Sequence, residues 1–500
     1  MWSDRPSRSR RTRIARRLRA VLPAPAPGSR GSKTPLRSGA RRDEPGPEAL
    51  ADLFREQPRE QPGLAWLDGG PGASRLYPRP IATLAVHSGR ATVEGPGGRE
   101  TFKAGGFELL EAAFEAWGDT AGAVLAGYLG YELANEIEPL PSPPPDDLDL
   151  PDLHLALYDA GLLWDGRGWT LEATGAWGGP SLTAIEAERL LAAARRRTKP
   201  ERPGGRLAGG PVVSRPNRGG YEAAVERIRE RIAAGEIFQA NLCRRLEAPL
   251  DPQSVWPFYL RLRDASPADH GAFLDLGQGR SLLSVSPELF LTVRGAQVET
   301  RPIKGTRPRG ASPREDRALA RELAESAKDR AELTMIVDVA RNDLGRVCEP
   351  GSVEVPVHGE LVSLPTVHHT VSTVRGRLLP GTGPADLLRA SFPPASITGA
   401  PKIRAMSILA NEEERRRGPA MGAFGWISLA GGGLEVAGGG DLELAVAIRT
   451  AVCADSRVVY HAGCGIVADS DPELEFEESA VKAKAFLIAL AAALGAAEPT

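Results

Sequence analysis

The chain has little cysteine, few aromatic residues and no long apolar run. Aromatic residues make up 5% of its 500 residues, and no segment approaches the roughly 18 consecutive apolar residues that a membrane span requires. Its four cysteines (Cys243, Cys348, Cys453 and Cys464) have neither the spacing of a zinc site nor the density of a disulfide framework. The sequence therefore predicts a protein without membrane spans, located in a reducing cytoplasm.

Acidic residues are nearly absent from the first 42 positions, which contain 12 arginines, one lysine and only Asp4. We expect residues 1–48 to be a disordered Arg-rich extension; a transit peptide or an over-long start assignment are the alternatives. The remaining chain has 49 basic and 63 acidic residues, a balance of −14. The negative charge of this remaining chain argues against nucleic-acid binding as the main function. Only the basic residues 1–42 would support such a function.

The length predicts two domains or one large composite fold. A first region covers residues 49–195, with an expected strand at 65–68, a Pro-rich surface loop at 139–151 and a closing helix at 182–195. Residues 196–219 are rich in Gly, Pro and Arg and are expected to form a linker. Residues 220–491 form the second region, which contains every motif discussed below.

A helix and a strand are predicted at the start of the second region. One helical face carries four apolar residues, and Gly235 is placed to end that helix. In the strand that follows, strict alternation turns four polar or sulfur-containing side chains to one face, which we expect to line a ligand site. The helical residues are Tyr221, Val225, Ile228 and Ile232, and the strand residues are Gln239, Asn241, Cys243 and Arg245.

Two further patterns carry reactive groups. Lys304 lies between Pro302 and Gly305-Thr306, where a lysine is a solvated loop residue, an electrostatic clamp or a nucleophile. Glu475, Glu478 and Lys482 share one face of a C-terminal helix, as a solvated acidic face or a cation site. Residue types and spacing leave these alternatives open.

Residues from about 210 to 490 resemble the chorismate-utilising enzymes, the family of anthranilate synthase component I and aminodeoxychorismate synthase component I. The resemblance implies an α+β fold of two facing antiparallel β-sheets wrapped by helices. The blocks that carry it, in chain order, are EIFQANLCRR (236–245), SPE (286–288), PIKGTR (302–307), AELTMIVD (331–338), RNDLG (341–345), VHH (367–369), SITGAPK (396–402), AIRT (447–450), AGCGI (462–466) and residues 469–482.

The resemblance also implies a magnesium site and a chorismate site. Glu332 and Glu478 match ligands of Mg²⁺, with Glu475 a direct or water-mediated ligand, and the ion would hold the ring carboxylate of chorismate. Arg449 matches the arginine that binds the enolpyruvyl carboxylate, a task that suits a guanidinium fork. The expected substrate contacts are Thr450, Thr398, Gly463, Gly465 and Lys482, and the matching active-site histidine is His369. Lys402 is expected to support its loop.

Three positions bear on the reaction. Glu288 matches the general acid that protonates the departing C4 hydroxyl. Gln239 stands where water-using relatives carry a lysine base, so ammonia is the expected nucleophile. Lys304 stands where anthranilate synthases place alanine and aminodeoxychorismate synthases place the lysine that attacks C2. The resemblance therefore favours 4-amino-4-deoxychorismate as the product, by a transaminase-class reaction that leads to p-aminobenzoate and folate.

Ammonia requires a source, and the chain lacks the Gly-x-Cys-x-Gly motif of a glutaminase nucleophile. We therefore expect a separate glutamine amidotransferase subunit, which docks on the second region. The alternatives are anthranilate synthase component I and a catalytically inactive scaffold that only recruits a glutaminase; the intact Glu332, Glu478, Arg449 and Lys304 argue against the scaffold.

Overall fold

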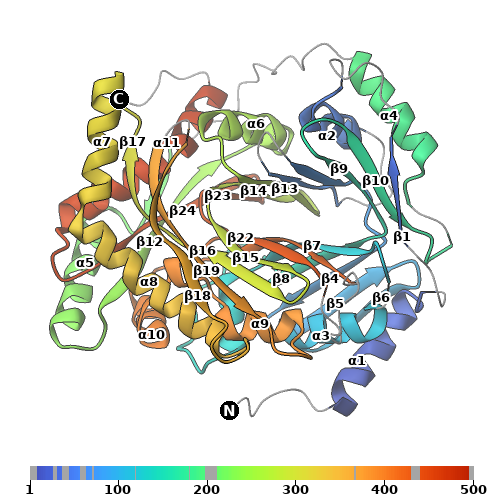
Figure 1. Ribbon diagram of the computed structural model, residues 1–500, viewed down its shortest axis with the longest axis horizontal. Helices are drawn as coiled ribbons and strands as arrows, with labels where there is room; N and C mark the ends of the chain where they lie inside the picture. The colour runs from blue at the N-terminus through green and yellow to red at the C-terminus, as the bar shows by residue number, and fades with distance from the viewer. Residues whose placement is uncertain are drawn as a thin grey trace.

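Two antiparallel sheets of twelve strands each lie face to face in this computed structural model, and helices cover their outer sides (Figure 1). The structure describes residues 8–25, 31–36, 44–56, 63–69, 73–118, 120–178, 181–196, 211–364, 367–429 and 440–494. This arrangement confirms the expected α+β fold.

The first sheet, sheet A, takes strands from both halves of the chain. Its order is β1 (Gly31–Pro35), β10 (Trp169–Thr174), β9 (Ala160–Trp164), β3 (Ser74–Tyr77), β2 (Ala65–Asp68), β13 (His270–Gly277), β14 (Arg280–Ser286), β23 (Thr450–Ala454), β24 (Arg457–Ile466), β12 (Gln239–Pro249) and β11 (Val213–Arg215), and β20 (Gly399–Ala400) pairs with β12.

The second sheet, sheet B, also takes strands from both halves of the chain. Its order is β17 (Ile303–Pro308), β19 (Val367–Arg377), β16 (Gln297–Arg301), β15 (Leu289–Arg294), β22 (Leu442–Val446), β21 (Ala423–Ser428), β7 (Val124–Leu129), β8 (Leu153–Tyr158), β4 (Ala82–His87), β5 (Arg90–Gly95) and β6 (Gly98–Lys103), and β18 (Glu354–Ser363) pairs with β19. Because both sheets combine strands of regions 49–195 and 220–491, these regions form one composite fold. Most of the expected linker, residues 197–210, lies outside the described residues.

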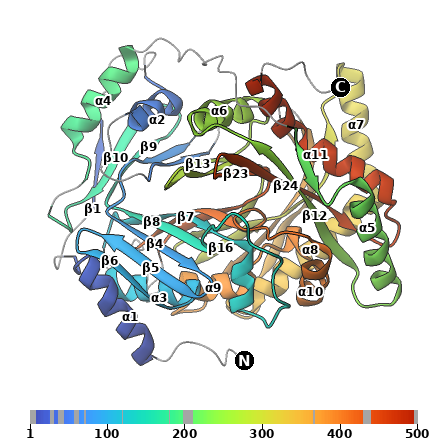
Figure 2. The ribbon, with the colours of Figure 1, turned by 180° about the vertical axis from the view of Figure 1, so that it is seen from behind.

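Helices pack on the outer face of each sheet, and Figure 2 shows the same layers from behind. Between the sheets, one end is closed by an apolar core that includes Tyr77, Tyr128, Tyr158 and Trp426. The helices on sheet B are α1 (Arg8–Val21), α3 (Gly106–Trp117), α7 (Pro313–Glu325), α8 (Ala327–Gly345) and α9 (Pro384–Ser391). Those on sheet A are α2 (Pro47–Glu56), α4 (Ala184–Arg196), α5 (Arg218–Ala233), α6 (Val255–Ala265), α10 (Lys402–Glu412) and α11 (Pro472–Leu494).

The expected disordered extension is wrong for the parts of residues 1–48 that the structure describes. Helix α1 buries Ile14, Leu18 and Val21 in the core beneath sheet B, next to α3. These residues recur at intervals of three and four, so they form an apolar stripe on a helix whose other faces are basic. Strand β1 pairs with β10 at the edge of sheet A.

Two local predictions near the start of the second region are confirmed. Helix α5 ends at Ala233, and Gly235 has a φ of +75°, a left-handed conformation that glycine adopts without strain. The strand that follows is β12, of which most side chains are buried.

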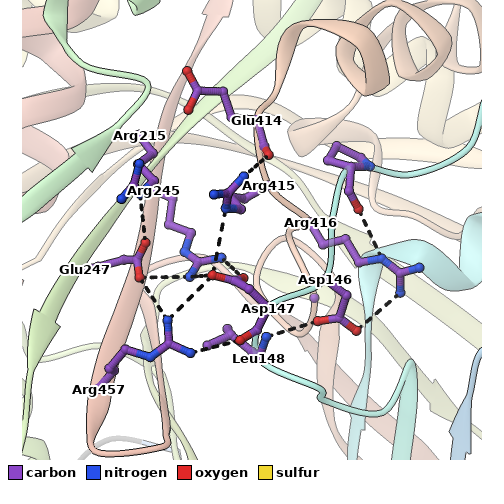
Figure 3. Close-up of polar contacts among 12 residues, drawn as sticks. Asp146, Asp147, Leu148, Arg215, Arg245, Glu247, Glu414, Arg415, Arg416 and Arg457 are labelled. Atoms are coloured by element: carbon purple, nitrogen blue, oxygen red, sulfur yellow. Dashed lines mark hydrogen bonds and ion pairs between the residues drawn. The ribbon is translucent and has the colours of Figure 1, made fainter.

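The Pro-rich segment 139–151 is irregular and, apart from two buried leucines, exposed or partly exposed, but it is anchored to sheet A (Figure 3). Leu148 and Leu150 are buried against β23 and β24. The Asp147 carboxylate accepts two hydrogen bonds from Arg245 of β12, at 2.6 and 2.9 Å. Arg457 of β24 donates to the Asp147 carbonyl oxygen at 2.9 Å. We call residues 139–151 the strap.

Every helix among the described residues is too short or too polar to span a bilayer.

Candidate active site

The predicted catalytic residues meet between the two sheets, at the end away from the tyrosine-rich core. Gly465 of β24 lies where a Cβ atom would be 2.0 Å from Gln239 Nε2 and 3.3 Å from Lys304 Nζ. Gln239 is on β12 of sheet A, whereas Lys304 is on β17 of sheet B. A side chain at 465 would displace the ends of both side chains, so glycine there leaves them room to approach each other across the gap.

Only the Gln239 end of the polar face of β12 lies at this site. The backbone of Asn241 and of Cys243 is held by hydrogen bonds from Arg417 to the Asn241 carbonyl (2.7 Å) and from the Cys243 amide to Glu413 (3.0 Å). Arg245 binds the strap. The expectation that this whole face of β12 lines a hydrated ligand site is thus too broad. Arg417, Glu413 and the strap bind the part of the strand beyond Gln239. Gln239 Oε1 itself is buried without a hydrogen bond.

Lys304 is presented by an irregular part of β17. The register with β19 shifts between Lys304 and Thr306, and the intervening Gly305 has a φ of +78°. The Thr370 hydroxyl of β19 donates to the Lys304 carbonyl oxygen and fixes the backbone there. The ammonium group is thereby held toward Gly465 of β24.

Glu288 lies between β14 and β15 and is 4% exposed. Burial raises the pKa of its carboxyl group to about 7, although the nearby Ser396 hydroxyl and the Lys304 charge oppose that shift. The Ser396 oxygen is itself buried and accepts no hydrogen bond from the described residues. At neutral pH a substantial fraction of Glu288 is therefore protonated and able to act as an acid.

His369 links β17 to Arg449, the arginine predicted to bind substrate. Its Nδ1 lies 2.9 Å from the Thr306 hydroxyl, and its Nε2 lies 3.4 Å from an Arg449 nitrogen. Burial, and next the Arg449 charge, lower the pKa of His369 to about 4, so the ring is neutral. Because a guanidinium can only donate, Nε2 is the acceptor and Nδ1 carries the proton.

Arg449 and Thr450 are positioned by the start of β23. Arg449 has a φ of +48°, a conformation that non-glycine residues seldom adopt, and burial lowers the pKa of its guanidinium. The Thr450 hydroxyl lies 2.8 Å from that of Ser284 in the neighbouring strand. Apart from the long contact with His369, the structure gives the Arg449 side chain no hydrogen bond among the described residues.

Two of the predicted metal ligands form an acidic cluster with a thiol at the start of α11. Ligand atoms of Cys464, Glu475 and Glu478 lie within 4.8 Å of one another. Glu475 accepts a 2.6 Å hydrogen bond from Ser470, and Lys482 pairs with Glu478 at 2.8 Å. The positive charge of Lys482 lowers the pKa of Glu478.

Glu332 of α8 approaches this cluster from the opposite side. Burial raises the pKa of Glu332, the Lys304 and Lys328 charges oppose the shift, and the negative charge of Glu478 adds to it. Burial also raises the pKa of the Cys464 thiol far above its usual range, so it stays protonated. The donors that remain are carboxylate oxygens, which fit the preference of Mg²⁺.

Two of the predicted substrate contacts, Thr398 and Gly463, stabilise the local backbone in this structure. The Thr398 hydroxyl is fully buried and donates to the Pro394 and Ala395 carbonyl oxygens within its own turn. A Cβ at Gly463 would lie 2.3 Å from the Leu242 carbonyl oxygen, so close pairing of β24 with β12 requires glycine there. The Gly463 carbonyl accepts from Lys482 at 3.0 Å.

Sequence reasoning assigned no role to Asp343 or Ser396, although both lie in quoted motifs. Lys402 supports its loop, as expected: its ammonium group binds Asp343 at 2.6 Å and two backbone carbonyls. The sequence feature that could have identified Asp343 is its position on the apolar side of α8, where a buried acid requires a partner.

A family model described as chorismate binding enzyme matches residues 63–488. The chain belongs to the chorismate-binding enzyme family. It is 42% identical to anthranilate synthase component 1 of Thermus thermophilus over 73% of this chain and 77% of that protein. It is 37% identical to aminodeoxychorismate synthase component 1 of Escherichia coli K12 over 71% of this chain and 74% of that protein.

The solved structures also include an anthranilate synthase. The crystal structure of anthranilate synthase component I from Streptococcus pneumoniae TIGR4 has a TM-score of 0.70 at 29% identity. The match covers 83% of this chain and 91% of that one. Chorismate-binding enzymes with two different products are thus similar to this chain, so overall identity does not choose between them.

Proposed function

We propose that this chorismate-binding enzyme is aminodeoxychorismate synthase component I, which converts chorismate and ammonia to 4-amino-4-deoxychorismate. The observation that carries the proposal is the position of Lys304 Nζ, which is turned into the space between the sheets beside Gln239 and Gly465. A half-buried lysine with the buried Glu288 nearby supplies both a nucleophile and an acid.

Lys304 acts as the nucleophile once its ammonium group has given a proton to solvent. Its nitrogen bonds to C2 of chorismate, the ring double bonds shift, and the C4 hydroxyl leaves as water with the proton of Glu288. Ammonia then bonds to C4 and the C2–nitrogen bond breaks, which returns Lys304 as a neutral amine. The extra proton on the new C4 ammonium returns to the Glu288 carboxylate, so charge and protons balance.

The other residues bind and orient the substrate. Arg449 holds the enolpyruvyl carboxylate, and His369 accepts one of its hydrogen bonds, which orients the guanidinium. Gln239 cannot act as a base, so water is not activated at C2. Mg²⁺, when bound by Glu332, Glu475 and Glu478, supplies positive charge for the ring carboxylate.

Glutamine is the proposed source of ammonia, through a glutamine amidotransferase partner. The names of the Thermus thermophilus and Escherichia coli relatives both contain "component 1", which implies a second component for those enzymes. This supports a partner here, and an ammonium salt should replace it in vitro.

Anthranilate synthase component I is the second candidate, favoured by the 42% identity to the Thermus thermophilus enzyme. The deciding experiment incubates purified protein with chorismate, Mg²⁺ and an ammonium salt. We expect a product that yields p-aminobenzoate when a lyase is added. Fluorescent anthranilate formed without any lyase would contradict the proposal.

A further inference from the structure

Two cavities meet at one side chain, Asp343 of α8. A groove of about 830 Å³ on the outer surface is lined by α8, α10 and the loop after α9. A cavity of about 20 Å³ lies inside, between α8 and β15, and Glu288 and Ser396 form part of its wall. The inner cavity has room for one molecule the size of water or ammonia. Chorismate is far too large for it.

The wall between the groove and the inner cavity consists of an ion pair and a turn of backbone. Lys402 Nζ binds Asp343 Oδ2 at 2.6 Å, the Ser391 carbonyl at 2.9 Å and the Pro393 carbonyl at 3.0 Å. No step of the proposed reaction uses this buried pair. Its carboxylate lines both spaces.

Polar atoms with unused hydrogen-bonding capacity lie at both ends of the inner cavity. Asp343 Oδ1 is buried and accepts no hydrogen bond from the described residues; an Arg346 nitrogen lies 3.5 Å away. Ser396, at the Glu288 end, is 7% exposed; its hydroxyl lies beside the Glu288 carboxyl group, and its oxygen accepts no hydrogen bond within the described part of the chain. Buried polar groups of this kind are costly unless a small polar molecule satisfies them.

We propose that ammonia reaches C4 through this route: from the outer groove, past the Asp343–Lys402 pair, into the inner cavity beside Glu288. The inference rests on the proposed function, in which Glu288 protonates the hydroxyl that leaves C4. Ammonia in the inner cavity therefore arrives at the carbon that this hydroxyl vacates.

The chemistry of ammonia suits the cavity. Its N–H groups can donate to the Asp343 carboxylate and to the Ser396 hydroxyl oxygen, which leaves its lone pair free to attack. A small buried space disfavours the charged ammonium ion, so the neutral nucleophile is the form that enters. After the new C4–nitrogen bond forms and the Lys304–C2 bond breaks, the Glu288 carboxylate is placed to take the surplus proton.

The test fills the inner cavity without touching a charged group. Ala340 of α8 and Ala395 line it from two sides and are 6% and 9% exposed. In Ala340→Val, we expect the KM for ammonium chloride to rise about tenfold or more while the KM for chorismate changes less than about twofold. Ala327→Val, at an exposed position in the first turn of the same helix, is the matched control and should change neither KM.

Ala395→Val provides the same test from the other wall if Ala340→Val does not fold. An unchanged KM for ammonium in a folded variant would overturn the route and leave the proposed function standing, and so would equal increases in both KM values. A wild-type enzyme that aminates chorismate only at C2 would instead overturn the proposed function itself.

Discussion

Glu288 shows how one residue sets the pH range of the reaction. Burial raises the pKa of its carboxyl group from 4.5 to about 7, and the protonated form is the one that can assist departure of the hydroxyl. Glu288 keeps its proton up to neutral pH because its carboxylate form is poorly solvated in the folded protein.

We predict that the slope of log kcat/KM for chorismate against pH becomes less positive by about one unit near pH 7, where Glu288 loses its proton, when the concentration of neutral ammonia is held constant. Steady-state rates between pH 6 and pH 9 would measure this. Buffering at constant neutral ammonia is essential, because the supply of this nucleophile rises with pH. A profile with no change of slope near pH 7 would contradict the acid role of Glu288.

The same shift predicts a change in stability. Because the folded state binds this proton more tightly than the unfolded state, the free energy of unfolding falls as the pH rises from 4.5 to about 7, by about 3 kcal/mol for Glu288 alone. Glu288→Gln should therefore be more stable than wild type at pH 8 and have no such advantage at pH 4. Urea unfolding at the two pH values measures it; an equal effect at both would contradict the shift.

At the scale of elements, β12 holds the site in register through contacts far from it. Arg417 donates to the Asn241 and Ile397 carbonyl oxygens, which ties β12 to the turn that carries Ser396. Farther along β12, Arg245 is 2% exposed and bound to Asp147 of the strap and to Glu247. The strap thus neutralises a buried charge on the strand that presents Gln239.

We predict that Asp147→Asn lowers the free energy of unfolding by about 2 kcal/mol, because a buried guanidinium loses one of its two carboxylates. Asp149→Asn is the matched control: the Asp149 side chain is 75% exposed in its ion pair with Arg280, and its loss should cost less than about 0.5 kcal/mol. Urea unfolding measures both, and equal values would contradict the anchoring role of the strap.

Elements with strong local signals could be predicted from the sequence. The end of α5 just before Gly235 and the strand at 65–68 follow from local patterns, which are complete within a few residues. The pairing of Lys304 with Gln239 across two sheets is a long-range contact that no local pattern contains; only the family resemblance suggested it. The Asp343–Lys402 pair was missed because its partners lie on separate elements.

At the scale of the whole molecule, the two halves of the chain are interleaved in both sheets, and the N-terminal helix α1 completes the outer layer of sheet B. The prediction of disorder for this helix was wrong because it gave the Arg-rich composition more weight than the stripe of three apolar residues. Leu18 is fully buried in this core, whereas Arg16 of the same helix is exposed.

We predict that Leu18→Ala lowers the free energy of unfolding by about 2–4 kcal/mol and leaves kcat unchanged, because it creates a cavity far from the site. Arg16→Ala should be neutral in both respects. Thermal unfolding and steady-state rates measure this. A Leu18→Ala protein as stable as wild type would show that α1 does not contribute to the core.

The measurement that tests the central claim most directly is a search for the covalent intermediate. Purified protein is mixed with chorismate and Mg²⁺ without ammonia, quenched in acid and mapped by peptide mass spectrometry. We predict that Lys304 carries the substrate ring, that Lys304→Ala does not become modified, and that added ¹⁵N-ammonium converts the adduct to a product labelled at C4. Labelled product from an enzyme whose Lys304 is never modified, or label at C2, would contradict the account.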